Sequence, residues 1–368
     1  MVKGSLHENG IINKTILYML IDSSIYNKWK DVDKINKNET PIYTHKMNQI
    51  MGTNIFGYVT YVTLSKDFST IACSIKSYLI IWDIINDIVV CKRDPFYLNG
   101  NLIDFIELTN NGSIAITYQK TENTSHTSPS PTCPLNSIIH ILDLSDGKIC
   151  IKDTLCMELY NRKIALSPDN TMLVLCSQDY NSSVYIYYNN MDTKMLNYKH
   201  KIMHIKINNA SIITISEDNK LIIIGYTTGD IYIWSLLENE MNCIQKINEL
   251  NNKITSLVLS LDNTILVAGY NNGVINVWNL DDNIYNIVTS FKVLHYINGI
   301  AISSDNSMIV SLTHHCICIW NLENYLEECV TIPCDIQKPR WAKNIRFSED
   351  NTKIVVCFTT IVIIYNLL

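Results

Sequence analysis

The sequence is short of charge. Charged residues make up 17% of the chain, against about 25% in an ordinary globular protein. The 29 basic and 35 acidic residues give a net charge of −6. Nucleic acid repels an acidic chain unless a basic stripe is present, and no basic run is longer than pairs such as Lys92–Arg93. We therefore expect no nucleic-acid partner.

Long apolar runs and paired cysteine motifs are also missing. No stretch of 18 apolar residues occurs, so the sequence predicts no membrane span and no membrane partner. The 12 cysteines include no Cys-x-x-Cys pair, and most sit in apolar, strand-like runs such as Thr70–Ser74. This pattern is typical of buried free thiols in a reducing compartment, which predicts an intracellular, cytoplasmic protein.

The motifs of common enzymes are absent as well. The chain has no Gly-x-Gly-x-x-Gly, no Gly-Lys-Ser/Thr phosphate loop, no His-Glu-x-x-His and no Gly-x-Ser-x-Gly. The densest set of possible metal ligands is His314–Cys318. On a strand, Cys316, Cys318 and Trp320 point to one side, which favours thiols packed beside a buried Trp over a metal site. We expect no catalytic residue, no cofactor and no metal.

One segment recurs instead: an apolar strand that ends in an aromatic residue, followed by a polar residue and Leu or Ile. Ile80–Ile84 and Cys318–Leu322 are two clear copies. The recurring position falls at residues 82, 142, 187, 234, 278, 320 and 365. The intervals are 42 to 47 residues, except for the first, which is 60.

A turn signal shares this register. Asp followed by Asn, or a related pair, separates two strand-like runs at residues 67, 111, 169, 218, 262, 305 and 350. Asp accepts backbone N–H groups at a turn, and Asn or Gly tolerates a positive φ at the next position. Each unit therefore contains hairpins, and β-branched runs such as Leu221–Ile224 indicate strands covered on both faces. A unit of four strands and about 45 residues, repeated seven times, predicts an all-β, seven-bladed β-propeller of four-stranded antiparallel blades.

This sequence resembles the WD-repeat family over about residues 41–368. Trp-Asp itself occurs once, at Trp82-Asp83, and the family's Gly-His dipeptide is missing. The resemblance therefore implies that the buried Asp–His–Ser–Trp hydrogen-bond network is absent or partial. It also implies a ring closed by an N-terminal strand, and Pro41–Lys46 suits that place. The blades expected are 57–94, 101–153, 160–206, 209–247, 253–292, 296–332, and 341–368 together with 41–46.

Two segments lie outside the repeats. Residues 1–40 form an N-terminal extension in which Ile25, Trp29 and Val32 have helical spacing. The Asn- and Ile-rich sequence resembles proteins of large DNA viruses that join a BTB/POZ domain to WD repeats, although 40 residues are too few for an intact BTB/POZ domain. The second segment, 120–135, is rich in Ser and Pro and falls between the second and third strands of the second blade. Ser128 and Ser130 each precede a proline and are candidate phosphorylation sites, although a neutral insertion explains the segment as well.

The resemblance also implies where partners bind, because family proteins dock peptides and domains on the narrow face of the ring. The position before each first strand gives Tyr58, Leu102, Tyr160, Asn209, Lys253, Tyr296 and Trp341. Exposed aromatic residues are frequent at the centres of interfaces. Together with Arg340, Tyr180 and Phe358, the aromatic members of this set predict a partner-binding surface: Tyr58, Tyr160, Tyr180, Tyr296, Arg340, Trp341 and Phe358. The alternative is that these rings fold down and cap the core.

The interpretation that follows is a non-enzymatic scaffold whose partners are proteins or peptides. One alternative is a substrate-receptor subunit of a ubiquitin-ligase-type assembly, with residues 1–40 as the tie to an adaptor. A propeller enzyme is the third alternative, but it needs converging carboxylates or a metal in the channel, and the predicted mouth is aromatic and hydroxylic.

Overall fold

A computed structural model describes most of the chain beyond its first 42 residues. The described residues are 43–46, 59–65, 67, 69–75, 77–85, 88–90, 96–98, 102–109, 114–120, 137–144, 149–157, 162–169, 171–177, 184–190, 195–202, 210–237, 240–247, 252–280, 286–322, 329–333, 342–348, 350–358 and 361–366. All regular structure within these ranges is β-strand. In the same part of the chain, no helix has the length and apolar character to cross a membrane.

Consecutive strands pair into separate antiparallel sheets. The first three sheets contain β2 (Val59–Leu64), β3 (Thr70–Ile75), β4 (Tyr78–Ile85), β5 (Ile88–Val90) and β6 (Phe96–Tyr97); β7 (Ile103–Leu108), β8 (Ile114–Lys120), β9 (Ser137–Asp143) and β10 (Cys150–Met157); and β11 (Arg162–Leu166), β12 (Met172–Ser177), β13 (Val184–Asn190) and β14 (Met195–Ile202).

The later sheets have the same order. They contain β15 (Ala210–Ile215), β16 (Leu221–Tyr226), β17 (Ile231–Leu237) and β18 (Glu240–Ile247); β19 (Ile254–Leu259), β20 (Ile265–Tyr270), β21 (Val274–Asn279) and β22 (Asn286–Lys292); β23 (Gly299–Ile302), β24 (Met308–Leu312), β25 (Cys316–Asn321) and β26 (Val330–Pro333); and β27 (Ala342–Phe347), β28 (Lys353–Phe358) and β29 (Ile361–Asn366), joined by β1 (Tyr43–Lys46).

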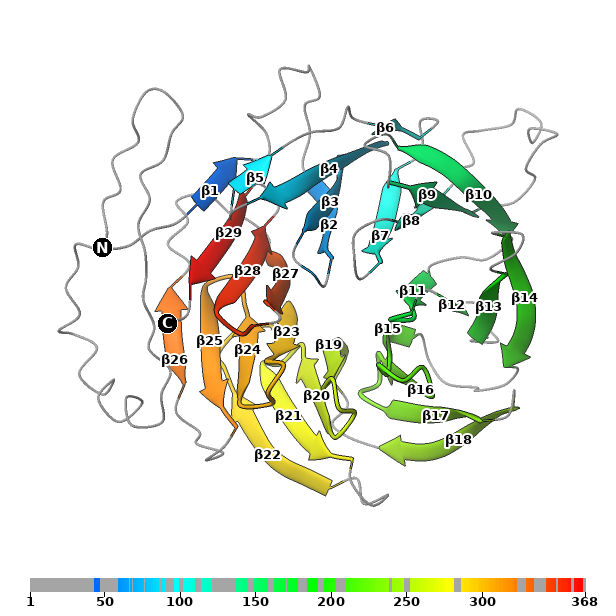
Figure 1. The fold of residues 1–368 in the computed structure, drawn as a ribbon. Helices are drawn as coiled ribbons and strands as arrows, with labels where there is room; N and C mark the ends of the chain where they lie inside the picture. Colours follow the sequence, from blue (N-terminus) through cyan, green and yellow to red (C-terminus); the bar gives the residue numbers. More distant parts are fainter. Residues whose placement is uncertain are drawn as a thin grey trace, which may run out of the picture.

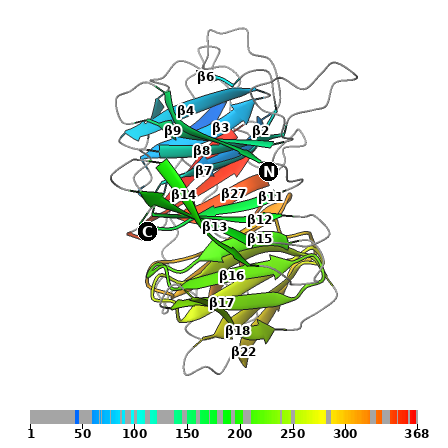
Figure 2. The ribbon, with the colours of Figure 1, turned by 90° about the vertical axis from the view of Figure 1, so that its right-hand side faces the viewer.

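The sheets stand around a common centre, with the first strand of each sheet innermost (Figure 1). Outer strands such as β14 and β18 follow the rim, as the edge view in Figure 2 also shows. This arrangement is a β-propeller, and the predicted all-β propeller fold is confirmed.

The N-terminal strand β1 lies in the same sheet as the end of the chain. It pairs antiparallel with β29, with Tyr43 opposite Ile364 and Lys46 opposite Ile361. Figure 1 shows β1, in blue, beside the red β29. The pairing of an N-terminal strand with the last repeat, expected from the resemblance for residues 41–46, is present at residues 43–46, where β1 covers the edge of β29.

The first sheet departs from the expected four strands. Its outer part is divided between two short strands, because β5 pairs with one end of β4 while β6 pairs with the other end, at Tyr78 and Leu79. The rings of Tyr78 and Tyr97 lie 5.1 Å apart across this second contact. The expectation of one continuous fourth strand is therefore wrong for this sheet.

The recurring aromatic position occupies the third strand of its sheet in every copy. Trp82, Trp278 and Trp320 are almost fully buried in β4, β21 and β25, and Leu142 is buried at the matching place in β9. The Trp320 indole Nε1 donates to Ser311 Oγ at 3.2 Å, whereas Nε1 of Trp82 and of Trp234 has no hydrogen-bond partner among the described residues. The predicted polar network is accordingly partial.

The turn signal forms a repeated hydrogen-bonded cluster. In the turn after β19, Ser260 Oγ donates to Asp262 Oδ1 at 2.6 Å, and Asp262 accepts from the Thr264 N–H and hydroxyl. Asn263 takes a positive φ of 65°, as predicted for the residue after Asp. The Ser–Asp hydrogen bond recurs in the turns that carry Asp67, Asp169, Asp218, Asp305 and Asp350.

The apolar side chains form cores between sheets rather than one central core. One cluster joins Val174 and Ile186 of one sheet to Ile222 and Trp234 of the next. Similar clusters bridge the neighbouring pairs of sheets further along the chain. Second strands such as β24 are buried along their whole length, which fits strands covered on both faces. The expectation of buried cysteines is wrong for Cys150 and Cys243, which are exposed on outer strands.

Candidate functional site

Strand connectivity separates the loops onto two faces of the propeller. The Ser–Asp turns between first and second strands lie on one face. The loops between second and third strands, and the connections from each sheet to the next, lie on the opposite face. This second face is where the sequence predicted a partner-binding surface.

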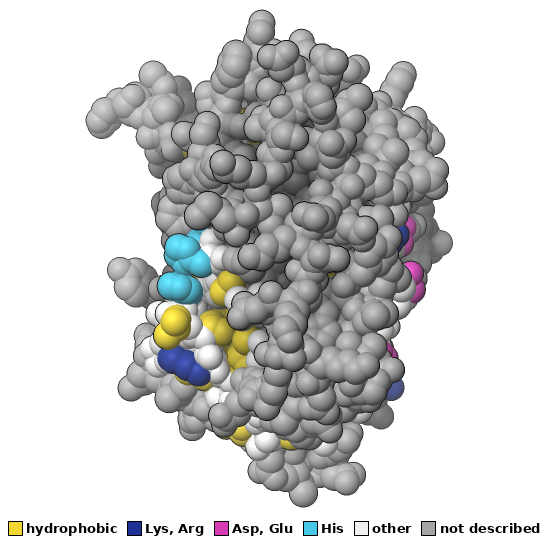
Figure 3. All heavy atoms as spheres, turned by 90° about the vertical axis from the view of Figure 1, so that its left-hand side faces the viewer, with side chains coloured by type: hydrophobic (Ala, Val, Ile, Leu, Met, Phe, Trp, Pro, Cys, Tyr) yellow, Lys and Arg dark blue, Asp and Glu magenta, His cyan; other side chains and the backbone are white. Residues whose placement is uncertain are grey.

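A cluster of aromatic, imidazole and apolar side chains lies on this second face, at the β23–β26 sheet. We call it the His–Tyr patch, and it consists of Leu294, His295, Tyr296, His314 and His315. Leu294 is 94% exposed and Tyr296 is 41% exposed. Figure 3 shows histidine side chains gathered with apolar side chains on this side of the molecule.

Two loops build the patch. Residues 293–298 connect β22 to β23, and residues 313–315 connect β24 to β25. Their side chains meet in pairs, because the His295 and His315 rings lie 4.4 Å apart and the Tyr296 and His314 rings lie 6.5 Å apart and nearly parallel. Partial burial raises the pKa of the Tyr296 hydroxyl, so this side chain stays a neutral donor and acceptor near neutral pH.

The preceding sheet contacts the loop of residues 293–298 through Gly273, which lies between β20 and β21. The Val293 N–H donates to the Gly273 carbonyl at 2.9 Å. Gly273 has a φ of 84°, and a Cβ built on it would stand 2.3 Å from the Val293 carbonyl oxygen and 2.8 Å from that of His295. Only glycine fits at position 273, because a side chain there would collide with the backbone of the loop that carries the patch.

Of the predicted partner-binding residues, Tyr296 is the one whose side chain the structure describes. Tyr296 is exposed, and its ring faces that of His314 on the loop between β24 and β25. Phe358 ends β28, and its side chain is not among those described. The other predicted site residues lie outside the described residues: Tyr58, Tyr160, Tyr180, Arg340, Trp341, Ser128 and Ser130.

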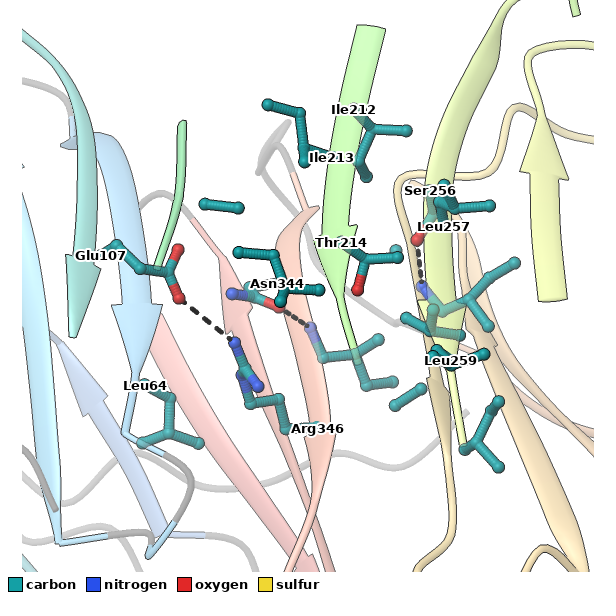
Figure 4. A pocket seen from close by; sticks show the side chains of 18 of the residues that line it. Leu64, Glu107, Ile212, Ile213, Thr214, Ser256, Leu257, Leu259, Asn344 and Arg346 are labelled. Atoms are coloured by element: carbon teal, nitrogen blue, oxygen red, sulfur yellow. Dashed lines mark hydrogen bonds and ion pairs between the residues drawn. The ribbon is translucent and has the colours of Figure 1, made fainter. Parts of the chain in front are cut away.

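A second feature is the cavity at the centre of the propeller. It has a volume of about 670 Å³ and is lined by the innermost strands. Figure 4 shows Glu107 of β7 and Arg346 of β27 facing each other across part of it, with a Glu107 Oε1 to Arg346 Nη2 distance of 3.8 Å. Ser256 Oγ, by contrast, accepts from the Ile300 N–H of the next sheet, so this hydroxyl ties two sheets together.

Polar groups line this cavity in a partly desolvated setting. Arg346 Nε and Asn298 Nδ2 have no hydrogen-bond partner among the described residues. Burial, followed by the nearby Lys253 ammonium, lowers the pKa of Lys163, and burial raises the pKa of Tyr61. The cavity thus has room and donors for a polar group from a bound chain.

Sequence reasoning missed the histidines of the patch and the ion pair of the cavity. His314 and His315 were considered only as metal ligands, and His295, Glu107 and Arg346 were not singled out. No group of three or more metal-binding side chains in the described part of the chain is placed to hold an ion. The signal that could have found the patch is Leu294–Tyr296, an apolar and aromatic segment directly before a first strand.

Comparisons with known proteins agree with the fold. Residues 199–313, under a third of the chain, match a family model described as the Vps8 beta-propeller. A search of curated proteins gives no match. The matched segment runs from β14 to the loop that carries His314, so this chain is similar to a Vps8-type propeller in the sheets that lead up to the His–Tyr patch.

Proposed function

We propose that this protein is a non-enzymatic scaffold that binds a protein or peptide segment at the His–Tyr patch. The observation that carries the proposal is the exposure of Leu294 and Tyr296 on a loop that Gly273 holds in place. A large apolar side chain that is 94% exposed costs free energy in water, and a partner that covers it removes that cost.

The composition of the patch fits recognition of another chain. Tyrosine combines a wide apolar ring with a hydroxyl, and aromatic side chains of this kind dominate binding energy at interfaces. The neighbouring imidazoles add hydrogen-bond donors and acceptors with little flexibility. The similarity to a Vps8-type propeller supports a role in protein interaction, because propellers present many loops on a rigid frame.

We further propose that the sheets are the seven blades of one closed ring. Neighbour contacts between innermost strands support this proposal: they run from β2 through β7, β11, β15, β19, β23 and β27 and return to β2. The β1–β29 pairing supports closure at the last blade. An intracellular, cytoplasmic location is part of the same proposal, supported by free thiols on both buried and exposed strands.

Partner capture with matched variants tests the function. The chain is immobilised as wild type, as Leu294→Ala/Tyr296→Ala, and as the control Ile244→Ala/Leu261→Ala. The control removes two exposed apolar side chains, 43% and 50% exposed, from an outer strand and from a turn on the opposite face. We expect the first double variant to lower the affinity of the main partner at least about tenfold and the control to leave it unchanged.

Circular dichroism and thermal unfolding establish that both variants are folded. Capture by the folded Leu294→Ala/Tyr296→Ala variant at wild-type affinity contradicts the proposal. A hydrolase or transferase activity that survives purification of the chain to homogeneity contradicts its non-enzymatic part.

A further inference from the structure

Three cysteine thiols meet beneath the His–Tyr patch. Cys316 and Cys318 lie two residues apart on β25, so their side chains leave the strand on the same side. Their Sγ atoms are 3.6 Å apart. Cys329, just before β26, lies beside them, with its Sγ 3.5 Å from Thr331 Oγ1, which is itself 3.9 Å from Cys318 Sγ.

The two thiols of β25 differ in their access to solvent. Cys318 is 2% exposed and packs in the core beside Trp320. Cys316 is half-buried and stands at the end of the strand next to the loop of His314 and His315. A reagent from solvent therefore reaches Cys316 first and finds Cys318 directly behind it.

The surroundings of Cys316 stabilise its thiolate. The hydrogen bond that pairs Cys316 with Cys318 lowers the pKa of Cys316, against the effect of burial, with further help from the Thr313 hydroxyl at 3.3 Å and from the charges of His295 and His315. The same hydrogen bond raises the pKa of Cys318, which holds the shared proton. A thiolate that is accessible and backed by a second thiol is the arrangement of a peroxide-reactive cysteine pair.

We propose that Cys316 and Cys318 form a redox-reactive pair in which Cys316 is the nucleophile toward hydroperoxides and Cys318 the resolving thiol. The Cys316 thiolate attacks the terminal peroxide oxygen, the O–O bond breaks, and the leaving alkoxide or hydroxide takes up a proton. Cys316 is then a sulfenic acid. Cys318 attacks the Cys316 sulfur, an S–S bond forms, and hydroxide leaves with the Cys318 proton as water. Two thiols lose two electrons, and the hydroperoxide gains them.

The geometry makes this disulfide easy to reduce again. Two residues of rise in a strand separate the Cα atoms by about 6.6–6.8 Å, at the upper limit for a disulfide. The sulfurs must also close from 3.6 Å to about 2.05 Å. A bond formed under such strain has a relatively oxidising potential and is returned to thiols by a cellular dithiol reductant.

Peptide mapping of the oxidised full-length chain tests the proposal. The reduced protein is treated with one equivalent of hydrogen peroxide, the remaining thiols are alkylated, and the chain is cleaved after Lys292 and Glu323. The peptide 293–323 contains Cys316 and Cys318 as its only cysteines. We expect this peptide to be lighter by two hydrogen atoms, to carry no alkyl group, and to regain both thiols with dithiothreitol.

A rate measurement on the unmodified wild type gives a second readout that needs no variant. Cys243 is exposed, and burial of part of its thiol raises its pKa, so it is the internal control. At pH 7 we expect iodoacetamide to alkylate Cys316 about fivefold faster than Cys243, because the larger thiolate fraction outweighs the lower intrinsic nucleophilicity. A separate experiment uses the variant Cys318→Ser, which lacks the resolving thiol. In this variant we expect dimedone to trap the sulfenic acid at Cys316.

Each of several results overturns the proposal. One is a wild-type 293–323 peptide that remains fully alkylated after peroxide treatment, and another is a peptide that carries sulfinic acid in place of the internal disulfide. Alkylation of Cys316 no faster than that of Cys243 contradicts the proposal as well. A disulfide that links Cys318 to Cys329 instead also rejects Cys316 as the nucleophile.

Discussion

The sheets from β15 to β29 and the first sheet, β2 to β6, use the same repeat in different ways. In the later sheets, Asn follows Asp in each described turn and takes a φ between 55° and 65°, as at Asn219 and Asn306. Neighbouring turns are also tied together, because Asn263 Oδ1 accepts from the Glu217 N–H and Asn306 Nδ2 donates to Asp262 Oδ2. In the first sheet Phe68 stands where Asn stands later, and the outer position is split between β5 and β6. Regular turn chemistry therefore accompanies regular sheets.

Substitutions at two equivalent positions, one in each region, give the largest expected effect on the free energy of unfolding. In the first sheet, the Leu98 N–H donates to the Ser77 carbonyl at 2.9 Å, as the Val293 N–H donates to Gly273. Gly273→Ser places a side chain at positive φ against two carbonyl oxygens, so we expect a loss of about 2–4 kcal/mol in the free energy of unfolding. Ser77→Gly is the matched exchange and should cost under about 1 kcal/mol. Urea unfolding measures both, and equal losses would show that the two loops are supported alike.

The second comparison concerns two buried tryptophans, Trp320 in a later sheet and Trp82 in the first sheet. Trp320→Phe leaves the Ser311 hydroxyl, which is fully buried, without the indole N–H that it accepts from, whereas the Trp82 indole N–H has no described partner to lose. We expect Trp320→Phe to destabilise the protein by about 1–2 kcal/mol more than Trp82→Phe. Thermal and chemical unfolding of the two variants check this difference. A larger loss for Trp82→Phe would mean that the Trp320–Ser311 bond contributes nothing.

The turn asparagines allow a smaller, separable test. Asn263→Ala must hold a non-glycine, non-asparagine residue at a φ of 65° and loses the bond to Glu217, so we expect a cost of about 1–2 kcal/mol. Asn263→Gly keeps the φ at no steric cost and should lose only about 0.5–1 kcal/mol. Chemical denaturation separates the two contributions, and identical losses would assign the whole effect to the hydrogen bond.

The smallest effect is the pH dependence of the turns. Burial opposes ionisation of Asp262, but hydrogen bonds from Ser260, Thr264 and Asn306 lower its pKa to about 2. The folded-state pKa is below the unfolded value, so the stabilisation is present above about pH 4 and is lost as the pH falls toward 2. We expect Asp262→Asn to flatten the decline of stability between pH 4 and pH 2. A decline as steep as in the wild type would remove Asp262 from the acid response.

The sequence predicted the features that each repeat carries within itself. The Asp–Asn pairs mark the turns and the position of Trp278 marks the third strand, because turn chemistry and strand alternation are local properties. Contacts between repeats were not predictable in the same way. The approach of Glu107 on β7 to Arg346 on β27 depends on how far successive sheets rotate about the axis, which no spacing within one repeat encodes. The split strand of the first sheet was missed although Asp94-Pro95, a pair that favours a turn, stands between β5 and β6.

Because the apolar cores lie between sheets, a destabilising substitution in one sheet also affects its neighbours. Ile222 contributes to a cluster with the preceding sheet, while Ile223, the next residue, contributes to a cluster with the following sheet. A substitution that shifts β16 therefore disturbs the partners on both sides, and those sheets pass the disturbance onward through their own opposite faces. Such an architecture accepts substitutions in its loops, whereas a substitution that moves one strand requires compensating changes in the sheets on both sides.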